Sequence, residues 1–309
     1  LVPTYANAYP PLVSRGLVLN YDLGNSSSYT ANASTIYDLV GSFNSTGAAT
    51  NTTNESTSNG KALVFSGNAY LSMSSSMWSS FSSPYTDSIF MWVYPTGNGV
   101  LLDECDSGGG WHDSQIEVVN SNLYFSQWNG SPIYATTNLN RWQYVGFVYD
   151  GSSKNLYAYI NGNQVNSLTN FTRSYPSSTL FFNVAKGDGT NMGSGANGNF
   201  KFAGMQIYNT ALTAAEVKQN FLATQYRLGQ SIPTNVSASS SLATQGTTSF
   251  TGINPVPSSY VANIFTDSAT TQFVESATVV PGGTTFSGLQ PNTKYYPVSY
   301  THLTLPTKA

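Results

Sequence analysis

Apolar and polar residues alternate along most of the chain, in short runs separated by turn residues. The clearest case is residues 141–165, RWQYVGFVYDGSSKNLYAYINGNQV, where Asp150-Gly151 and Asn161-Gly162 each follow an apolar run. Both dipeptides accept positive φ and therefore favour tight hairpin turns. A period of two places the tyrosines of NLYAYI on one face of a sheet and its Leu, Ala and Ile on the other. The same pattern predicts strands at 16–22, 61–67, 88–95, 114–119, 122–128, 178–185 and 199–209.

One segment has a helical pattern instead. In LTAAEVKQNFLATQY, Glu216 follows Thr213 at the spacing of a capping box, and Val217 and Phe221 would share one face. We expect the main helix to run from Thr213 to Tyr226. Many short strands and one late helix predict an all-β fold, an antiparallel jelly-roll sandwich with one short C-terminal helix. Three residues at mid-strand positions are expected inside: Trp92, Trp142 and Phe147.

The character of the sequence changes after Gly229, where QSIPTNVSASSS is typical of a linker. We expect an extended, proline-containing lead-in at 1–13 and the jelly roll at 14–229. Residues 230–297 alternate like short strands and predict a second, smaller and partial β-sandwich. We expect residues 298–309 to form a separate tail.

The composition of the chain argues against several classes of function. Only 8% of the residues are charged, against about 25% in an ordinary domain. The net charge of −3 with 11 Lys+Arg argues against nucleic-acid binding, which needs clustered positive charge. No apolar run reaches 18 residues, so we expect no membrane insertion, and one cysteine cannot form an internal disulfide. Uncharged polar residues on short strands suit an extracellular or virion surface, and nothing indicates the oligomeric state.

Four separated segments resemble the laminin-G-like branch of the concanavalin-A-like jelly rolls, in the type found in phage and environmental virion proteins. They are GLVLNYDLGNSSSYTANASTIYDLVG (16–41), ALVFSGNAYLSM (62–73), the hairpin at 141–165, and FAGMQIYNTALTAAEVKQNF (202–221). Tyr37 stands where a tryptophan is usual before Asp-Leu. The resemblance implies a jelly roll, and some members carry calcium at a loop rim or hydrolyse glycosides.

The end of the chain carries two further resemblances. GLQPNTKYY resembles the end of a fibronectin type III module, which implies a tyrosine corner at Tyr295. The codons of 297–307 can be read back as a transposon-end adapter of shotgun sequencing libraries, and Pro297 is unfavourable inside a strand. We therefore interpret 298–309 as a non-native tail of an environmental (metagenomic) reading frame cut at both ends.

The stretch 101–118, LLDECDSGGGWHDSQIEV, holds the only cysteine and five of the fourteen carboxylates. Retaining glycosidases need two carboxyl groups about 5 Å apart. Laminarinase-like enzymes supply them as Glu-x-Asp-x-x-Glu, and here Glu104 and Asp106 fit while Gly109 replaces the second glutamate. No Gly-x-Ser-x-Gly elbow occurs, and Cys105 has no flanking cation to lower its pKa. We therefore predict that the protein is not an enzyme, with a glycoside hydrolase relative as one alternative.

The same carboxylates allow a metal site. Calcium takes six to eight oxygen ligands, and Asp103, Asp106 and Asp113 with loop carbonyls could supply some of them. The other interpretation of the acidic stretch is a solvated rim loop.

Aromatic residues beside the carboxylates indicate recognition. Trp111 follows three glycines, and Trp128 precedes an Asn-Gly turn. Lectins cover a sugar face with an aromatic ring and bind its hydroxyls through amides and carboxylates. We predict a ligand-binding rim of Trp111, His112, Asp113 and Trp128, in a non-catalytic module that recognises a glycan or other surface polymer. The further alternative is a structural module of a virion or surface fibre that binds no sugar.

Overall fold

The computed structural model describes residues 10–46, 53–57, 60–106, 112–125, 132–173, 178–186 and 197–228, with backbone only at 46, 112–114 and 226. It also describes the backbone of 234–242, 245–251, 260–265, 273–279, 284–287 and 296–301. The chain divides into two compact units, one spanning Pro11–Leu228 and one comprising Leu1–Pro10 and Gly229–Ala309. The domain limits expected from the sequence stay predictions.

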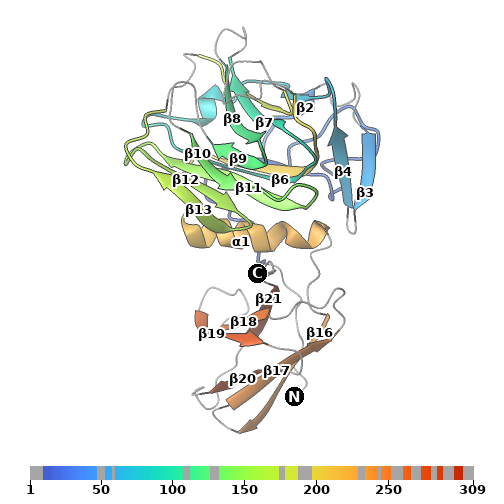
Figure 1. The fold of residues 1–309 in the computed structure, drawn as a ribbon, viewed down its shortest axis with the longest axis vertical. Coiled ribbons are helices and arrows are strands. Elements are labelled where there is room, and N and C mark those ends of the chain that lie inside the picture. Colours follow the sequence, from blue (N-terminus) through green and yellow to red (C-terminus); the bar gives the residue numbers. More distant parts are fainter. Residues whose placement is uncertain are drawn as a thin grey trace. The chain divides into compact units, whose positions relative to one another are not determined.

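The first unit contains an antiparallel eight-stranded sheet (Figure 1). Its strands run in the order β13 (Asn163–Leu168), β12 (Asn155–Ile160), β11 (Gln143–Asp150), β6 (Asp87–Pro95), β15 (Phe200–Tyr208), β4 (Gly60–Phe65) and β3 (Thr53–Thr57). The eighth, β1 (Leu17–Asp22), also pairs with β15.

A seven-stranded antiparallel sheet packs against it. Its order is β10 (Ile133–Thr136), β9 (Asn122–Phe125), β8 (His112–Val119), β7 (Gly99–Cys105), β14 (Phe181–Val184), β5 (Leu71–Met73) and β2 (Ser45–Thr46). The helices are η1 (Trp78–Ser80), α1 (Ala214–Thr224) and η2 (Gln225–Leu228). The predicted all-β jelly-roll sandwich with one short C-terminal helix is confirmed.

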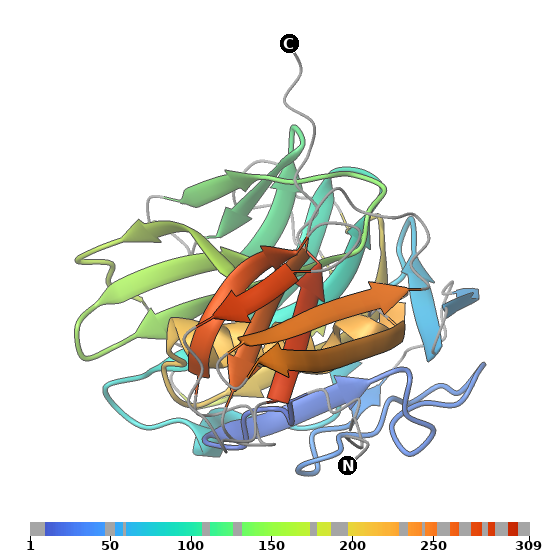
Figure 2. The same cartoon turned by 90° about the horizontal axis from the view of Figure 1, so that it is seen from below.

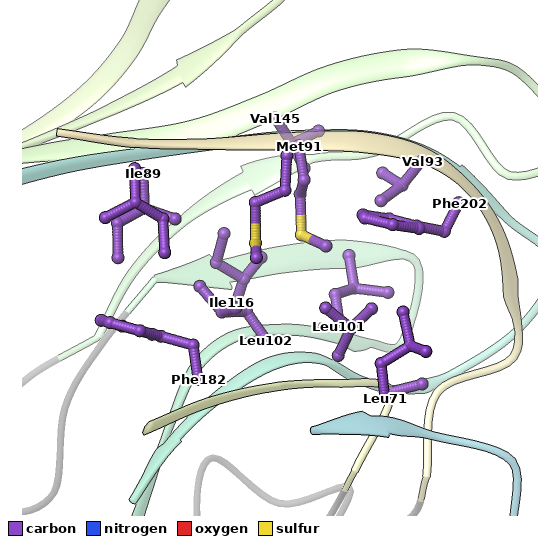
Figure 3. Close-up of a cluster of buried hydrophobic side chains, with 14 of the residues drawn as sticks. Leu71, Ile89, Met91, Val93, Leu101, Leu102, Ile116, Val145, Phe182 and Phe202 are labelled. Atoms are coloured by element: carbon purple, nitrogen blue, oxygen red, sulfur yellow. The ribbon is translucent and has the colours of Figure 1, made fainter. Parts of the chain in front are cut away.

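The core lies between the two sheets. In Figure 3, alternate residues of β6 point toward β7 and β8, so that Ile89, Met91 and Val93 face Leu101 and Ile116. All are fully buried. The period of two predicted for NLYAYI is also correct, because Leu156 and Ala158 lie in this core. Phe147 is inside, as expected.

Helix α1 covers the outer face of the eight-stranded sheet. The Trp92 indole nitrogen donates to Thr224 Oγ1 at 2.7 Å, and the ring lies 5.7 Å from that of Phe221. Strand β6 is therefore buried on both faces, which explains why it is an almost continuous apolar run. The predicted capping box of Thr213 and Glu216 is present. Trp92 is buried as expected, but beneath the helix and not between the sheets.

Two details differ from the sequence-based expectation. Trp142 precedes β11 and is only half-buried, with its ring against Tyr94 at 5.6 Å. The turn after β11 takes four residues and has its positive φ at Lys154. Glycine is needed at 151 for a different reason, since the backbone there passes the Tyr85 carbonyl too closely for any Cβ. The turn at Asn161-Gly162 has positive φ at both residues, as expected.

The Tyr-Asp-Leu-x-Gly segment is an anchor of the fold. Asp38 accepts backbone N–H bonds from Asn20 at 2.9 Å, Val40 at 3.0 Å and Gly41 at 3.0 Å. These bonds tie the loop to β1, while Tyr37 beside it is exposed. The aspartate therefore satisfies backbone donors, which explains its role without a ligand.

The second unit has two three-stranded antiparallel sheets, coloured brown to red in Figure 2. One has the order β16 (Thr234–Leu242), β17 (Gln245–Thr251) and β20 (Thr284–Ser287), and the other β19 (Phe273–Val279), β18 (Tyr260–Phe265) and β21 (Tyr296–Thr301). Pro297 lies inside β21, an edge strand, where a missing N–H is tolerated. Residues 298–301 belong to this strand, and the interpretation of 298–309 as a non-native tail stays a prediction. No helix in the described part of the chain could span a membrane.

Candidate functional site

The described parts of the acidic stretch belong to β7 and β8, in the middle of the seven-stranded sheet. Strand β7 carries Asp103, Glu104 and Cys105, and the first two are 2% and 0% exposed. The interpretation as a solvated rim loop is therefore wrong for these residues. A shift of register after Val100 puts both Leu101 and Leu102 into the core, and from there the alternation sends Glu104 inward and its two neighbours outward.

On the outer face of this sheet, a hydrogen-bonded network crosses three strands. Ser72 of β5 donates through Oγ to Asn183 Oδ1 of β14 at 2.7 Å. The Asn183 amide nitrogen donates to Asp103 Oδ2 at 3.2 Å and to Cys105 Sγ at 3.0 Å. Asp103 and Asn183 are buried, whereas Ser72 and Cys105 are partly accessible. The network thus reaches the surface at a hydroxyl and a thiol.

The Cys105 thiol has an elevated pKa. It is raised to about 11, mainly by burial and also by the charges of Asp103 and Asp106, while the Asn183 hydrogen bond and Lys186 act in the opposite direction. The thiol is therefore protonated at neutral pH, which makes Cys105 a poor nucleophile.

A pair of tyrosines lies across the sheet from this network. Tyr124 of β9 pairs in register with Glu117 of β8 and with Tyr134 of β10. The two tyrosine rings stack at 5.8 Å, and Tyr134 is 59% exposed. Sequence analysis did not select this pair, although the period of two in NLYF and IYAT places Leu123 and Ile133 in the core and the tyrosines outside.

The residues predicted to form the ligand-binding rim belong to β8 or to segments that follow β7 and β9 in the sequence. Strands β7 and β9 both run antiparallel to β8, so Cys105 and Phe125 end them on the same side. The connections that follow carry Trp111 and Trp128, which lie outside the described residues. Within β8, His112 pairs with Cys105 and Asp113 with Glu104, by backbone. These four residues stay a prediction.

The calcium ligands were predicted as Asp103, Asp106 and Asp113. Asp103 is buried and accepts a hydrogen bond from Asn183. Among the residues whose side chains are described, no three His, Cys, Asp or Glu gather as a metal site would require. Asp113 is not among them, so this site too stays a prediction.

Between the sheets, three charged side chains form a buried cluster that sequence analysis missed. Arg173 pairs with Asp87 of β6 and Glu104 of β7, and all three side chains are at most 1% exposed. The guanidinium carbon also lies 5.4 Å from the Phe147 ring centre. Among the described residues, one oxygen each of Asp87 and Glu104 is buried without a hydrogen-bond partner. The signal in the sequence was a carboxylate at each of two otherwise apolar strands, in a chain with few charges.

Burial dominates the electrostatics of this cluster. It raises the pKa of Glu104 to about 7, against the attraction of Arg173 and with the help of Asp87. It also raises the pKa of Asp87, again opposed by Arg173. Two carboxylates share one guanidinium, so the cluster is neutral only when one carboxyl carries a proton. Glu104, which the sequence suggested as a possible hydrolytic residue, is thus a structural link between the sheets.

Comparison with known proteins agrees with this fold. Residues 65–218 match the Laminin_G_3 family model, described as the concanavalin A-like lectin/glucanases superfamily. A Trypanosoma rangeli sialidase, solved with 2,3-difluorosialic acid, is similar with a TM-score of 0.52 and 15% identity, over 72% of this chain and 37% of that chain. Domain 4 of AbnA, a GH43 extracellular arabinanase from Geobacillus stearothermophilus solved with arabinotriose, has a TM-score of 0.45 and 18% identity, over 67% of this chain and 98% of that chain. No curated protein matches the chain.

One sequence-based prediction is overturned by these similarities. We expected a protein that is not an enzyme, yet the solved structures of similar fold include a sialidase. The expectation depended on the missing second glutamate at Gly109, and sialidases are exceptions to the arrangement of two carboxylates. The chain spans little more than a third of the sialidase, and the similarity shows the fold alone. The matched segment, residues 65–218, is a concanavalin A-like jelly-roll domain of the laminin-G-like type.

Proposed function

We propose that the jelly-roll domain binds carbohydrate on the outer face of its seven-stranded sheet. The observation that supports this most directly is the stacked pair of Tyr124 and Tyr134, with Tyr134 largely open to solvent. An aromatic ring covers the apolar face of a sugar, and nearby polar groups then fix its hydroxyls. The accessible ends of the network, Ser72 and Cys105, lie on other strands of the same face and would meet further sugar units of a polymer.

The proposed ligand set extends to the end of the sheet where β7 and β9 stop. Trp111, His112, Asp113 and Trp128 belong to it as further candidates for ring stacking and hydrogen bonding. The partner would be a glycan or another polymer on a cell or particle surface, met outside the cell or on a virion.

Replacing Tyr134 tests the proposal. Tyr134→Ala removes the exposed ring of the pair, and we expect glycan affinity to fall by 1–3 kcal/mol, about 5- to 150-fold. Thermal stability should stay nearly unchanged, since an exposed side chain contributes little to it. A glycan array with the full chain identifies a ligand, and isothermal titration then compares the two proteins.

Tyr37→Ala provides the matched control. Tyr37 is 54% exposed, close to the value for Tyr134, but lies beside the β1 loop anchored by Asp38. We expect the Tyr37→Ala variant to bind glycans with the same affinity as the unchanged protein. Equal affinity of Tyr134→Ala and Tyr37→Ala would move the site elsewhere, and a chain that binds no glycan would favour the structural fibre module.

We propose a spacer role for the second unit, as a partial fibronectin type III-like module. The six strands described in this unit are consistent with this, since the first, second and fifth form one sheet and the fourth, third and sixth the other. Such exchange of strands between two antiparallel sheets is typical of this class of sandwich. Tyr295, the expected tyrosine corner, lies outside the described residues. A calcium ion bound by Asp103, Asp106 and Asp113 remains part of the proposal for the first unit.

A further inference from the structure

We infer that the outer face of the seven-stranded sheet takes an uncharged glycan and rejects anionic sugars such as sialic acid or uronic acids. This inference rests on the proposed carbohydrate site. It concerns the chemical class of the ligand, which neither the family match nor the fold similarity assigns.

The first argument is the position of the four arginines in the structure. Recognition of a sugar carboxylate is the typical task of a guanidinium, which binds both oxygens at once. The chain has four arginines. Arg15 pairs with Glu216, Arg173 with Asp87 and Glu104 inside the sandwich, and Arg227 with Asp22. The fourth, Arg141, follows Asn140, whose N–H bonds to the Pro95 carbonyl at the end of β6 in the other sheet.

The second argument is the sign of the charge on the face itself. Asp103 lies in the network, and Glu117 lies in register with Tyr124. Lys186, at the end of β14, lies with its ammonium 5.4 Å from the Tyr70 ring centre. Among the charged groups that act on the Cys105 thiol, Asp103 and Asp106 raise its pKa and Lys186 lowers it. An anionic ligand would add a like charge, whose repulsion is strong because these carboxylates are poorly hydrated.

The third argument is hydrogen-bond chemistry. The accessible ends of the network are the Ser72 hydroxyl and the Cys105 thiol, both uncharged groups that can pair with the hydroxyls of a neutral sugar. A sugar carboxylate would gain no charge-assisted hydrogen bond from them. The stacked tyrosines offer an apolar surface to the C–H face of a ring, which needs no charge. Both parts of the face therefore suit an uncharged glycan.

The charge of the face can be measured without a known ligand. Cys105 is the only cysteine and is partly accessible. Methanethiosulfonates of similar size react with its thiolate, which forms a new disulfide while methanesulfinate leaves. We expect the trimethylammonium reagent to react about tenfold or more faster than the sulfonate reagent, relative to their ratio with 2-mercaptoethanol, because a negative face concentrates cations. Equal or reversed relative rates would overturn the inference.

A second thiol probe covers the case in which Cys105 reacts too slowly for its rates to be measured. Ser72→Cys in a Cys105→Ser background places a thiol at the other accessible end of the network, and the same ratio of rates is expected. Preference of this thiol for the sulfonate reagent would equally contradict a negative face.

Binding then separates this inference from the proposed function. The full chain is titrated, in EDTA so that no calcium bridge contributes, with uncharged polymers (arabinan, mannan, mixed-linkage glucan) and anionic ones (polysialic acid, polygalacturonate). We expect the uncharged polymers to bind at least tenfold more tightly. If an anionic polymer binds tightly and Tyr134→Ala weakens that binding, the inference of an uncharged ligand is wrong, while the proposed site is supported. Binding of no polymer would instead reject the proposed function.

Discussion

At the scale of single residues, the buried cluster of Arg173, Asp87 and Glu104 is the least expected feature of the domain. Replacing a buried ion pair by apolar residues is often neutral or stabilising, so such a cluster is weak evidence for stability. Here it links β6 of one sheet to β7 of the other, at the end where β7 and β9 stop. Its place beside the proposed rim suggests that it holds this end of the sandwich in one arrangement.

Glu104 should make the stability of the protein depend on pH. Its pKa is raised in the folded state to about 7, from an ordinary value of 4.5. The folded protein therefore binds more protons than the unfolded chain between these values, and the free energy of unfolding falls as pH rises from about 4.5 to about 7. Glu104→Gln cannot titrate, so we expect a flatter dependence, measured by urea unfolding of both proteins at pH 5 and pH 8. The same slope in both would show that Glu104 is not responsible.

At the scale of elements, helix α1 and strand β7 differ in how far their own sequence determines their structure. The helix has its own signals, since Thr213 and Glu216 satisfy backbone donors at its start whatever packs nearby. Strand β7 lacks such independence. Its residues Leu101 to Cys105 form a strand because β8 and β14 pair with them on either side.

The helix start allows a quantitative test. Thr213→Ala removes the hydroxyl that accepts the Glu216 N–H at 3.3 Å, and we expect unfolding to become easier by about 1 kcal/mol. Glu216→Gln keeps the capping geometry but loses the partly exposed pair with Arg15, which should cost less than about 1 kcal/mol. Chemical denaturation of both variants measures the difference. A loss with Glu216→Gln as large as with Thr213→Ala would mean that charge outweighs the cap.

At the scale of the whole molecule, the chain consists of two compact units, with boundaries in the sequence after Pro10 and after Leu228. The first has its own continuous core between its two sheets. A unit with its own core is expected to fold without the rest of the chain.

Ending the chain at Leu228 tests this independence. We expect the melting temperature of the first unit to change by no more than about 2 °C, because 1 kcal/mol corresponds to roughly 2–4 °C in a domain of this size. Differential scanning calorimetry of the full and the shortened chain gives the comparison. A drop of about 10 °C would show that the second unit stabilises the first.

The period of two, the turn residues and the capping box were enough to predict the class of fold, most strands and the helix. These signals act between residues close in sequence, so each can be recognised without knowing the partner strand. The tyrosine pair and the charged cluster could not be found in this way. Tyr124 meets Tyr134, and Glu104 meets Asp87 and Arg173, only because sheet order and a register shift in β7 bring them together. Pairing across strands depends on packing between distant segments, which no local pattern encodes.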